Sequence, residues 1–295
     1  MQDYSAPIDC VETAQLIVNR HYRDILECLG FDSFESVWRY SGGKTVKKVP
    51  ERSVTRIDIE VDGKQRNFYL KRHNSERLGG RRLLEFFTPK RRLSRGREEF
   101  QTICDFRKQN LTTVTAVAAG EQREGFLEES FVITEGFDPF VSLENLLKYR
   151  AEFRLRMENP TLRKLMLTEV ARFARKMHQA GYNHCDFNAD HILLHYQDGV
   201  DTPRVAIYDL QRVLRRKWSR FRWIIKSLAE LGFSLPAEYF DEEDRIHLFL
   251  SYKGKRTLSV WDRLQLLWIK KKTDRIRRHT EKHPYHPPEG NESSV

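Results

Sequence analysis

The sequence predicts an α+β fold in two lobes: an N-terminal antiparallel sheet with one helix, followed by a mainly helical C-terminal lobe. Period-two alternation of apolar residues prevails in the first half of the chain, whereas steps of three and four prevail afterwards. A short polar connector, Glu135 to Asp138, separates the two patterns. We therefore expect a small lobe over 1–134, a helical lobe over 135–283 and a disordered tail over 284–295.

A β-hairpin is the clearest element of the small lobe. Apolar residues alternate over 57–61 and again over 68–70, and the Asp62-Gly63 pair between them is a turn signal. The second strand ends in Lys71. Because strand side chains alternate, Lys71 faces away from Leu70.

Shorter segments indicate the rest of this lobe. The first forty residues favour a helical preface. A helix is expected from Arg97 to Lys108, and the apolar runs Val114 to Ala119 and Ser130 to Thr134 predict two further strands. The small lobe is thus mostly antiparallel sheet with a single helix packed in it.

One long amphipathic helix dominates the second lobe. It runs from about Pro160 to Gly181, with the proline near its start and the glycine past its end. Its apolar residues recur at steps of three and four and predict one buried face: Leu162, Leu165, Met166, Val170, Phe173, Ala174 and Met177. The helix ends shortly before His184. Two short strands follow, and the second ends at Asp209.

The segment HCDFNADHILLH, residues 184–195, concentrates histidines and acids directly after this helix. The order of polar residues along the chain resembles that of protein kinases. A strand lysine (Lys71) comes first, then a helix glutamate, a loop aspartate (Asp186), and a second aspartate after the next hairpin (Asp209).

Each residue of this arrangement has a physical role. Phosphoryl transfer depends on positioning, on charge neutralisation by lysine and Mg²⁺, and on an acceptor for the hydroxyl proton. Lys71 would bind the nucleotide phosphates, Asp186 would be the catalytic base, and Asp209 would bind Mg²⁺. His191 stands where protein kinases carry a second metal ligand, usually Asn, although Mg²⁺ prefers oxygen. We also count Glu135, at the start of the connector, among the candidate nucleotide-binding residues.

Departures from the protein-kinase pattern point to a narrower family. No G-x-G-x-x-G loop occurs, and Asp-Leu-Gln replaces Asp-Phe-Gly at 209–211. The segments FYLKRH, GREEFQTI, FVITE, VSLENLL, RFARKMHQAGYNHCDFNADHILLH and IYDLQR resemble the bacterial lipopolysaccharide core kinases of the Kdo/WaaP family, and its heptose kinases especially. In that family a His-x-Asp loop ends in His-x-Leu-Leu-His, and Asp-Leu-His/Gln-Arg follows later. These motifs stand here at 184–195 and 209–212, and the matching segments extend from about Val37 to about Arg220.

The resemblance implies a kinase that transfers the γ-phosphate of ATP to a sugar of the lipid A-core glycolipid, on the cytoplasmic face of the inner membrane. ATP and Mg²⁺ would lie between the lobes. Glu99 would pair with Lys71, ahead of Glu98, because Glu99-Phe100 aligns with the family's glutamate-aromatic pair. A heptose is preferred to Kdo as the acceptor sugar because of the histidine at position 191.

Several alternatives stay open. The chain could be a Kdo kinase, or the same fold could phosphorylate a small molecule or a protein. It could also be a catalytically silent pseudokinase or a basic nucleic-acid-binding module. The preferred interpretation expects no nucleic-acid partner. It treats His184 as a structural brace for the loop rather than as an acid or base.

The charge of the chain predicts an anionic partner. A net charge of +10 and a pI near 9.4 suit nucleic acid, an anionic membrane surface or a phosphorylated substrate. One basic segment, Arg77 to Arg97, could meet the acidic glycolipid or be a loop without a ligand. A second covers 253–282, and four apolar residues in it share a helical face: Trp261, Leu264, Leu267 and Trp268. That face suits packing on the large lobe or an anionic bilayer, at about 1 kcal/mol per basic residue near the surface. The plain alternative is a solvated helix whose apolar stripe belongs to the core.

The sequence also predicts a location. The N-terminus lacks a basic region followed by an apolar one, and no uninterrupted run of about 18 apolar residues occurs. We expect neither an export signal nor a transmembrane helix. The four cysteines lack the pair spacing of a zinc site and are expected to be free thiols. The expected location is therefore cytoplasmic and peripheral at the inner membrane.

Overall fold

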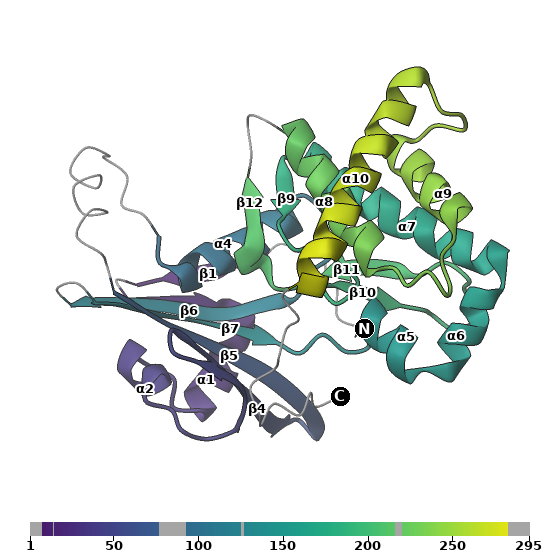
Figure 1. Ribbon diagram of the computed structural model, residues 1–295. Coiled ribbons are helices and arrows are strands. Elements are labelled where there is room, and N and C mark those ends of the chain that lie inside the picture. Colours follow the sequence, from purple (N-terminus) through teal and green to yellow (C-terminus); the bar gives the residue numbers. More distant parts are fainter. Residues whose placement is uncertain (1–7, 14, 77–92, 125–126, 216–219, 283–295) are drawn as a thin grey trace. The chain divides into compact units, whose positions relative to one another are not determined.

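The structure, a computed structural model, describes residues 8–13, 15–76, 93–124, 127–215 and 220–282 (Figure 1). It forms two compact units. The first holds the chain up to Asn110 together with Val114–Phe137, and the second holds Leu111–Thr113 together with the chain from Asp138. An antiparallel sheet dominates the first unit and helices dominate the second, so the predicted α+β class is confirmed. The predicted tail over 284–295 lies outside the described residues.

A seven-stranded antiparallel sheet forms the first unit, in the order β1-β2-β6-β7-β5-β4-β3. The strands are β1 (Cys10–Glu12), β2 (Leu16–Asn19), β3 (Lys44–Val49), β4 (Arg52–Val61), β5 (Lys64–Glu76), β6 (Thr115–Glu124) and β7 (Leu127–Glu135). The predicted hairpin is confirmed as β4 and β5. Asp62 and Gly63 between them have positive φ angles of 52° and 70°, which a two-residue hairpin turn favours.

The prediction of a helical preface over the first forty residues is wrong in part. Two strands, β1 and β2, precede the short helices η1 (Arg20–Tyr22), α1 (Arg23–Cys28) and α2 (Phe34–Trp38). The backbone of β2 pairs with β6 along Leu16–Val18. This pairing with a distant segment decides the conformation of a short apolar run that periodicity leaves ambiguous. The lysine-rich edge strand β3 was not predicted either, because its mostly exposed residues give no alternation signal.

The two faces of this sheet have different partners. Helices α1 and α2 pack on one face, around the buried side chains of Phe34, Phe68, Leu70 and Phe131. Helix α4 (Arg95–Lys108) lies against the opposite face (Figure 1). Because successive strand side chains alternate, Leu70 enters the core while Lys71 reaches α4, as predicted.

The second unit contains the helices α5 (Leu143–Tyr149), α6 (Ala151–Glu158), α7 (Pro160–Gln179), α8 (Arg220–Ser234), α9 (Glu242–Lys253) and α10 (Val260–Lys282). Helix α7 confirms the predicted long helix. Asn159 caps it by accepting the N–H groups of Thr161 and Leu162, and Pro160 takes the first helical position. None of the helices in the described part of the chain has the length and apolar character needed to cross a bilayer.

Short paired strands fix the positions of two loops in this unit. Strand β10 (Ile192–His195) pairs with β11 (Arg204–Ile207) and with β8 (Val141–Ser142), while β9 (Tyr182–His184) pairs with β12 (Val213–Arg215). The loop over 185–191 joins β9 to β10, and the segment over 208–212 joins β11 to β12. Because the strands at both ends are paired, these two connections run side by side.

Candidate active site

A buried ion pair joins β5 to α4 in the first unit. Lys71 Nζ lies 2.7 Å from Glu99 Oε1, and the two residues are only 9% and 1% exposed. Glu98, the alternative partner considered for Lys71, is exposed to solvent. Desolvation of two charges offsets much of the attraction between them, so a buried ion pair is weak evidence for stability.

Close packing of α4 on the sheet makes the pair possible. Ser94 caps the helix by accepting the N–H of Arg97. A Cβ atom on Gly96 would lie 2.3 Å from the carbonyl oxygen of Phe131, well inside contact distance. Only glycine permits this approach, so Gly96 lets α4 pack directly on β7 and brings Glu99 within reach of Lys71.

Glu135 ends β7 and is mostly buried. Its carboxylate accepts hydrogen bonds from the Tyr22 hydroxyl at 2.5 Å and from Arg66 Nε at 2.7 Å. These contacts fasten the end of β7 to η1 and β5. The side chain thus has partners within its own unit, and its predicted contact with nucleotide stays a prediction.

In the second unit, His184 braces the two adjacent loops. Its Nδ1 accepts the N–H of Asp186 at 3.2 Å, and its Nε2 donates to the carbonyl oxygen of Tyr208 at 3.3 Å. Burial, reinforced by the neighbouring His191, lowers the pKa of His184 to about 4. The ring is therefore neutral near pH 7 and acts through these two hydrogen bonds.

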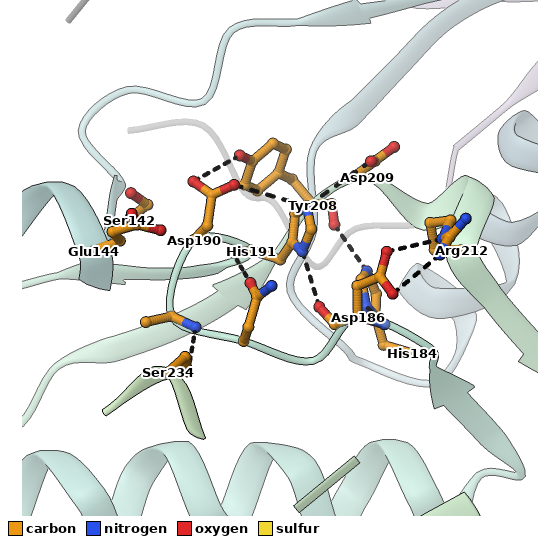
Figure 2. Close-up of polar contacts among 12 residues, drawn as sticks. Ser142, Glu144, His184, Asp186, Asp190, His191, Tyr208, Asp209, Arg212 and Ser234 are labelled. Atoms are coloured by element: carbon orange, nitrogen blue, oxygen red, sulfur yellow. Dashed lines mark hydrogen bonds and ion pairs between the residues drawn. The ribbon is translucent and has the colours of Figure 1, made fainter. Parts of the chain in front are cut away.

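Asp186 is held by a two-point contact with Arg212 (Figure 2). Arg212 Nε lies 2.8 Å from Oδ2 of the carboxylate, and Nη2 lies 3.1 Å from Oδ1. The hydrogen bond to Asp186 raises the pKa of Arg212. A bidentate guanidinium fixes the plane of a carboxylate as well as its position. The Asp186 side chain is 33% exposed, so solvent can still reach it.

His191 lies among three acidic or carbonyl groups. Its Nδ1 donates to the carbonyl oxygen of Asp186 at 2.8 Å. Its Nε2 lies 3.9 Å from Oδ2 of Asp190 and 3.9 Å from Oδ2 of Asp209. A ring nitrogen placed between two carboxylates can face a cation that all three groups bind.

The backbone at Asp209 is in the left-handed region, with φ 57° and ψ 54°. This region is uncommon for residues other than glycine, although Asp tolerates it better than most. The conformation turns the chain from β11 into the short helix η2 (Leu210–Arg212), which ends at Arg212. The same turn therefore positions Asp209 and also Arg212, the residue that binds the Asp186 carboxylate.

Within the residues that the structure describes, no group of three or more His, Cys, Asp or Glu side chains is arranged to hold a metal ion. Magnesium in nucleotide sites needs only one or two carboxylates, because phosphates and water complete its coordination. Asp209 supplies such a carboxylate, whereas the nitrogen of His191 is a ligand type that Mg²⁺ does not prefer. The Asp209 carboxylate alone fits Mg²⁺ shared with a nucleotide rather than a metal centre made by protein alone.

Two residues near this site, Asp190 and Tyr208, were not singled out from the sequence. The Tyr208 hydroxyl donates to Asp190 Oδ1 at 3.4 Å, and burial raises the pKa of both groups. The contact joins two loops, so periodicity contains no signal for it. The place of Asp190 directly before His191 was the one available sign.

The predicted site residues fall into two groups, one in each unit. Lys71, Glu99 and Glu135 belong to the first unit, and Asp186, His191 and Asp209 belong to the second. In the first unit Lys71 contacts Glu99, whereas Glu135 contacts Tyr22 and Arg66 instead; in the second unit His191 contacts Asp186 and lies near Asp209. The basic segment Arg77 to Arg97 lies mostly outside the described residues, so its proposed contact with glycolipid is not addressed by the structure.

A lysine-glutamate pair on an antiparallel sheet, with an aspartate loop and a later aspartate among helices, defines a phosphotransferase of the protein-kinase-like class. The chain belongs to the lipopolysaccharide kinase (Kdo/WaaP) family, whose model matches residues 36–252. The resemblance found in the sequence is thereby confirmed, and the chain is a phosphotransferase that acts on a sugar hydroxyl.

Three comparisons illustrate this relationship. The chain is 31% identical over 253 residues to the lipopolysaccharide core heptose(I) kinase WaaP of Pseudomonas aeruginosa, covering 84% of this chain and 91% of that protein. It is 28% identical to the protein of the same name from Escherichia coli K12, covering 86% and 94%. It is also similar to a solved structure described as WaaP in complex with acyl carrier protein, with a TM-score of 0.66 and 29% identity. That match covers 88% of this chain and 98% of the solved chain.

Proposed function

We propose that this protein is an ATP-dependent kinase that phosphorylates a heptose of the lipopolysaccharide inner core, at the cytoplasmic side of the inner membrane. The observation that supports this proposal most is the position of the Asp186 carboxylate. Arg212 binds this carboxylate, and the loop of Asp186 also carries His191. Relatives similar over most of this chain are named heptose(I) kinases, which favours heptose over Kdo as the acceptor sugar.

The nucleotide contacts in this proposal are divided between Lys71 and Asp209. Lys71 binds phosphate oxygens, and the buried Glu99 carboxylate keeps the ammonium group in place for them. Asp209 holds Mg²⁺, which neutralises charge on the phosphates when it is bound. Glu135 acts at the end of β7, where its contacts with Tyr22 and Arg66 fix the strand.

Asp186 acts on the acceptor in this proposal. Its carboxylate would accept the proton of the sugar hydroxyl as that oxygen bonds to the γ-phosphorus of ATP, while the bond from that phosphorus to the departing ADP breaks. Arg212 keeps the carboxylate in a fixed plane, and the His184 ring holds the backbone N–H of Asp186. These contacts reduce the freedom of the base before the sugar arrives, which is the main contribution that positioning makes to catalysis.

A second candidate function is binding of acyl carrier protein. Helices α8, α9 and α10 line a half-open pocket of about 450 Å³ with apolar walls that include Leu228, Leu248 and Phe249. Arg245, Lys270 and Arg277 also line it, together with Glu242 and Asp274, which pair with Lys270 and Arg277. An acyl carrier protein presents an acyl chain, and the apolar walls suit such a chain. The solved complex of WaaP with acyl carrier protein motivates this proposal for the present chain.

The experiment that tests the kinase function is mass spectrometry of purified inner-core glycolipid after incubation with the protein, ATP and Mg²⁺. Fragmentation that places one added phosphate on a heptose supports the proposal. A phosphate on Kdo would replace the heptose assignment with the Kdo alternative.

The second function is tested by size-exclusion chromatography of this protein with acyl carrier protein. We expect co-elution with the acylated carrier protein but not with the unloaded one, and Leu228→Trp, which fills the pocket, should abolish the co-elution. Equal retention of both carrier forms would contradict it.

A further inference from the structure

An aromatic cluster lies exposed where α8 meets α10. The rings of Phe221, Trp261 and Trp268 contact one another, with centroid separations of 6.2, 5.5 and 5.4 Å. The three residues are 42%, 52% and 40% exposed. Large aromatic side chains usually bury most of their surface, so an exposed contact of three rings indicates an interaction surface.

Apolar residues of α10 extend this cluster. Val260, Leu264 and Leu267 recur at helical spacing and are 78%, 40% and 54% exposed. The residues of α10 that are buried are polar instead: Asp262, Gln265 and Thr273. The interpretation that the apolar stripe belongs to the core is therefore wrong, because its four residues, Trp261, Leu264, Leu267 and Trp268, are 40–54% exposed.

The same outward side of α10 becomes cationic in its second half. The series that begins at Val260, Leu264 and Leu267 continues at steps of three and four with Lys271, Arg275 and Arg278, all exposed. Of the three acids on α10, Asp262 pairs with Lys255 and Asp274 pairs with Arg277, while Glu281 lies exposed in the last turn. The outward side of α10 thus joins an apolar, aromatic end to a positive end.

This combination has the character of an interfacial helix. Indole rings favour the boundary between water and acyl chains, where the ring is buried and its N–H stays near water. Lysine and arginine next to them attract anionic headgroups, and their aliphatic parts can lie along the apolar surface. We infer that Phe221 and the outward side of α10 dock on the surface of a bilayer that contains anionic phospholipid.

Charge selects the bilayer over a second copy of this chain. A symmetric contact through the same surface would place the cations of the two copies against each other, which costs free energy. Acyl carrier protein is the other partner considered above, and the test below separates it from lipid. The inference deepens the proposed function, since a glycolipid substrate lies in a membrane, but vesicle binding can be measured without any kinase activity.

The test uses the full-length protein and sedimentation with vesicles of phosphatidylcholine, alone or mixed with phosphatidylglycerol. We expect binding to the mixed vesicles, a blue shift of tryptophan emission, and weakening by salt. The double variant Trp261→Ser, Trp268→Ser and the double variant Lys271→Glu, Arg275→Glu should each lower the partition coefficient at least about tenfold. Leu155→Ser, which removes a 64% exposed leucine from α6, is the matched control and should bind like wild type.

Equal binding by wild type and both double variants would overturn the inference. So would loss of carrier-protein binding by the variants with unchanged vesicle binding, because the surface would then belong to that partner. Phosphorylation of a delipidated, water-soluble core saccharide should be the same for wild type and variants. A protein that binds vesicles but phosphorylates no core acceptor would refute the proposed function and leave the docking surface intact.

Discussion

Arg212 binds both carboxylate oxygens of Asp186, through Nε at 2.8 Å and Nη2 at 3.1 Å. Arg212 ends the short helix that starts after Asp209, so the proposed base and the proposed metal ligand are positioned through the same turn. A change at Arg212 should therefore affect the chemical step without removing any group that reacts.

Arg212→Ala should lower kcat about 10- to 100-fold with little change in KM for ATP, because a misplaced base costs rate rather than nucleotide affinity. Arg212→Lys should restore little, since an ammonium group cannot make the parallel two-point contact. Steady-state kinetics with core glycolipid measure this. Arg215→Ala, an exposed arginine three residues further on in β12, is the control. A normal kcat for Arg212→Ala would remove Arg212 from the mechanism.

Glu99→Gln should raise KM for ATP and lower kcat, because it leaves the Lys71 ammonium buried beside a neutral amide. Breaking a buried pair on one side costs roughly 3–5 kcal/mol of stability, so urea unfolding should also shift. The matched control is Glu98→Gln, one residue away and exposed, which should behave like wild type. If the two variants were indistinguishable, the assignment of Glu99 as the lysine partner would be refuted.

His191 can be tested as a metal ligand through metal preference. Nitrogen ligands favour Mn²⁺ over Mg²⁺ more than carboxylate or amide oxygens do. If the Nε2 atom coordinates, His191→Asn should lower the ratio of activity with Mn²⁺ to activity with Mg²⁺ several-fold. An unchanged ratio with lowered activity for both metals would assign His191 to positioning the loop through its hydrogen bond to Asp186 instead.

We predict that the folded protein loses stability in mild acid because of His184. Its pKa falls from an ordinary 6.5 to about 4 in the folded protein because the ring is buried. Between these values the unfolded chain binds the proton and the folded chain does not. The contribution of His184 to the free energy of unfolding is therefore complete above pH 6.5 and decreases as the pH drops towards 4. The loss should reach roughly 3 kcal/mol, at about 1.4 kcal/mol per pKa unit.

Urea unfolding at several pH values, with EDTA present, measures this loss. His184→Gln can keep an acceptor and a donor at the same site but does not titrate, so its stability should depend less on pH over this interval. A wild type and a variant with the same pH dependence would show that His184 is not the group responsible.

The residues predicted from sequence are those whose positions follow from local rules. Alternation in β5 was sufficient to place the Lys71 side chain on the other face of the sheet from Leu70. The helical pattern of α7 was sufficient to show where the helix ends, shortly before Asp186. Contacts between distant segments had no such signal. The pairing of β2 with β6, and the contact of Tyr208 with Asp190, depend on tertiary packing that a single sequence does not show.

Helix α10 shows a different limit. Its apolar spacing was recognised in the sequence, but spacing alone does not say which side of a helix faces the protein. The buried Asp262, paired with Lys255, and the buried Thr273, which donates to the carbonyl oxygen of Ala229, settle that question in favour of the polar side. Polar residues satisfied by specific partners can thus replace apolar ones at a helix contact.

Transfer of labelled phosphate from ATP to purified inner-core glycolipid, by wild type and by Asp186→Asn, tests the central claim most directly. The amide keeps the shape of the side chain but cannot accept the hydroxyl proton, so transfer to heptose should fall about 10²- to 10⁴-fold. Asp198→Asn, an exposed aspartate in the turn after β10, should keep full activity. Equal transfer by wild type and Asp186→Asn, or no transfer to heptose by the wild type, would contradict the account.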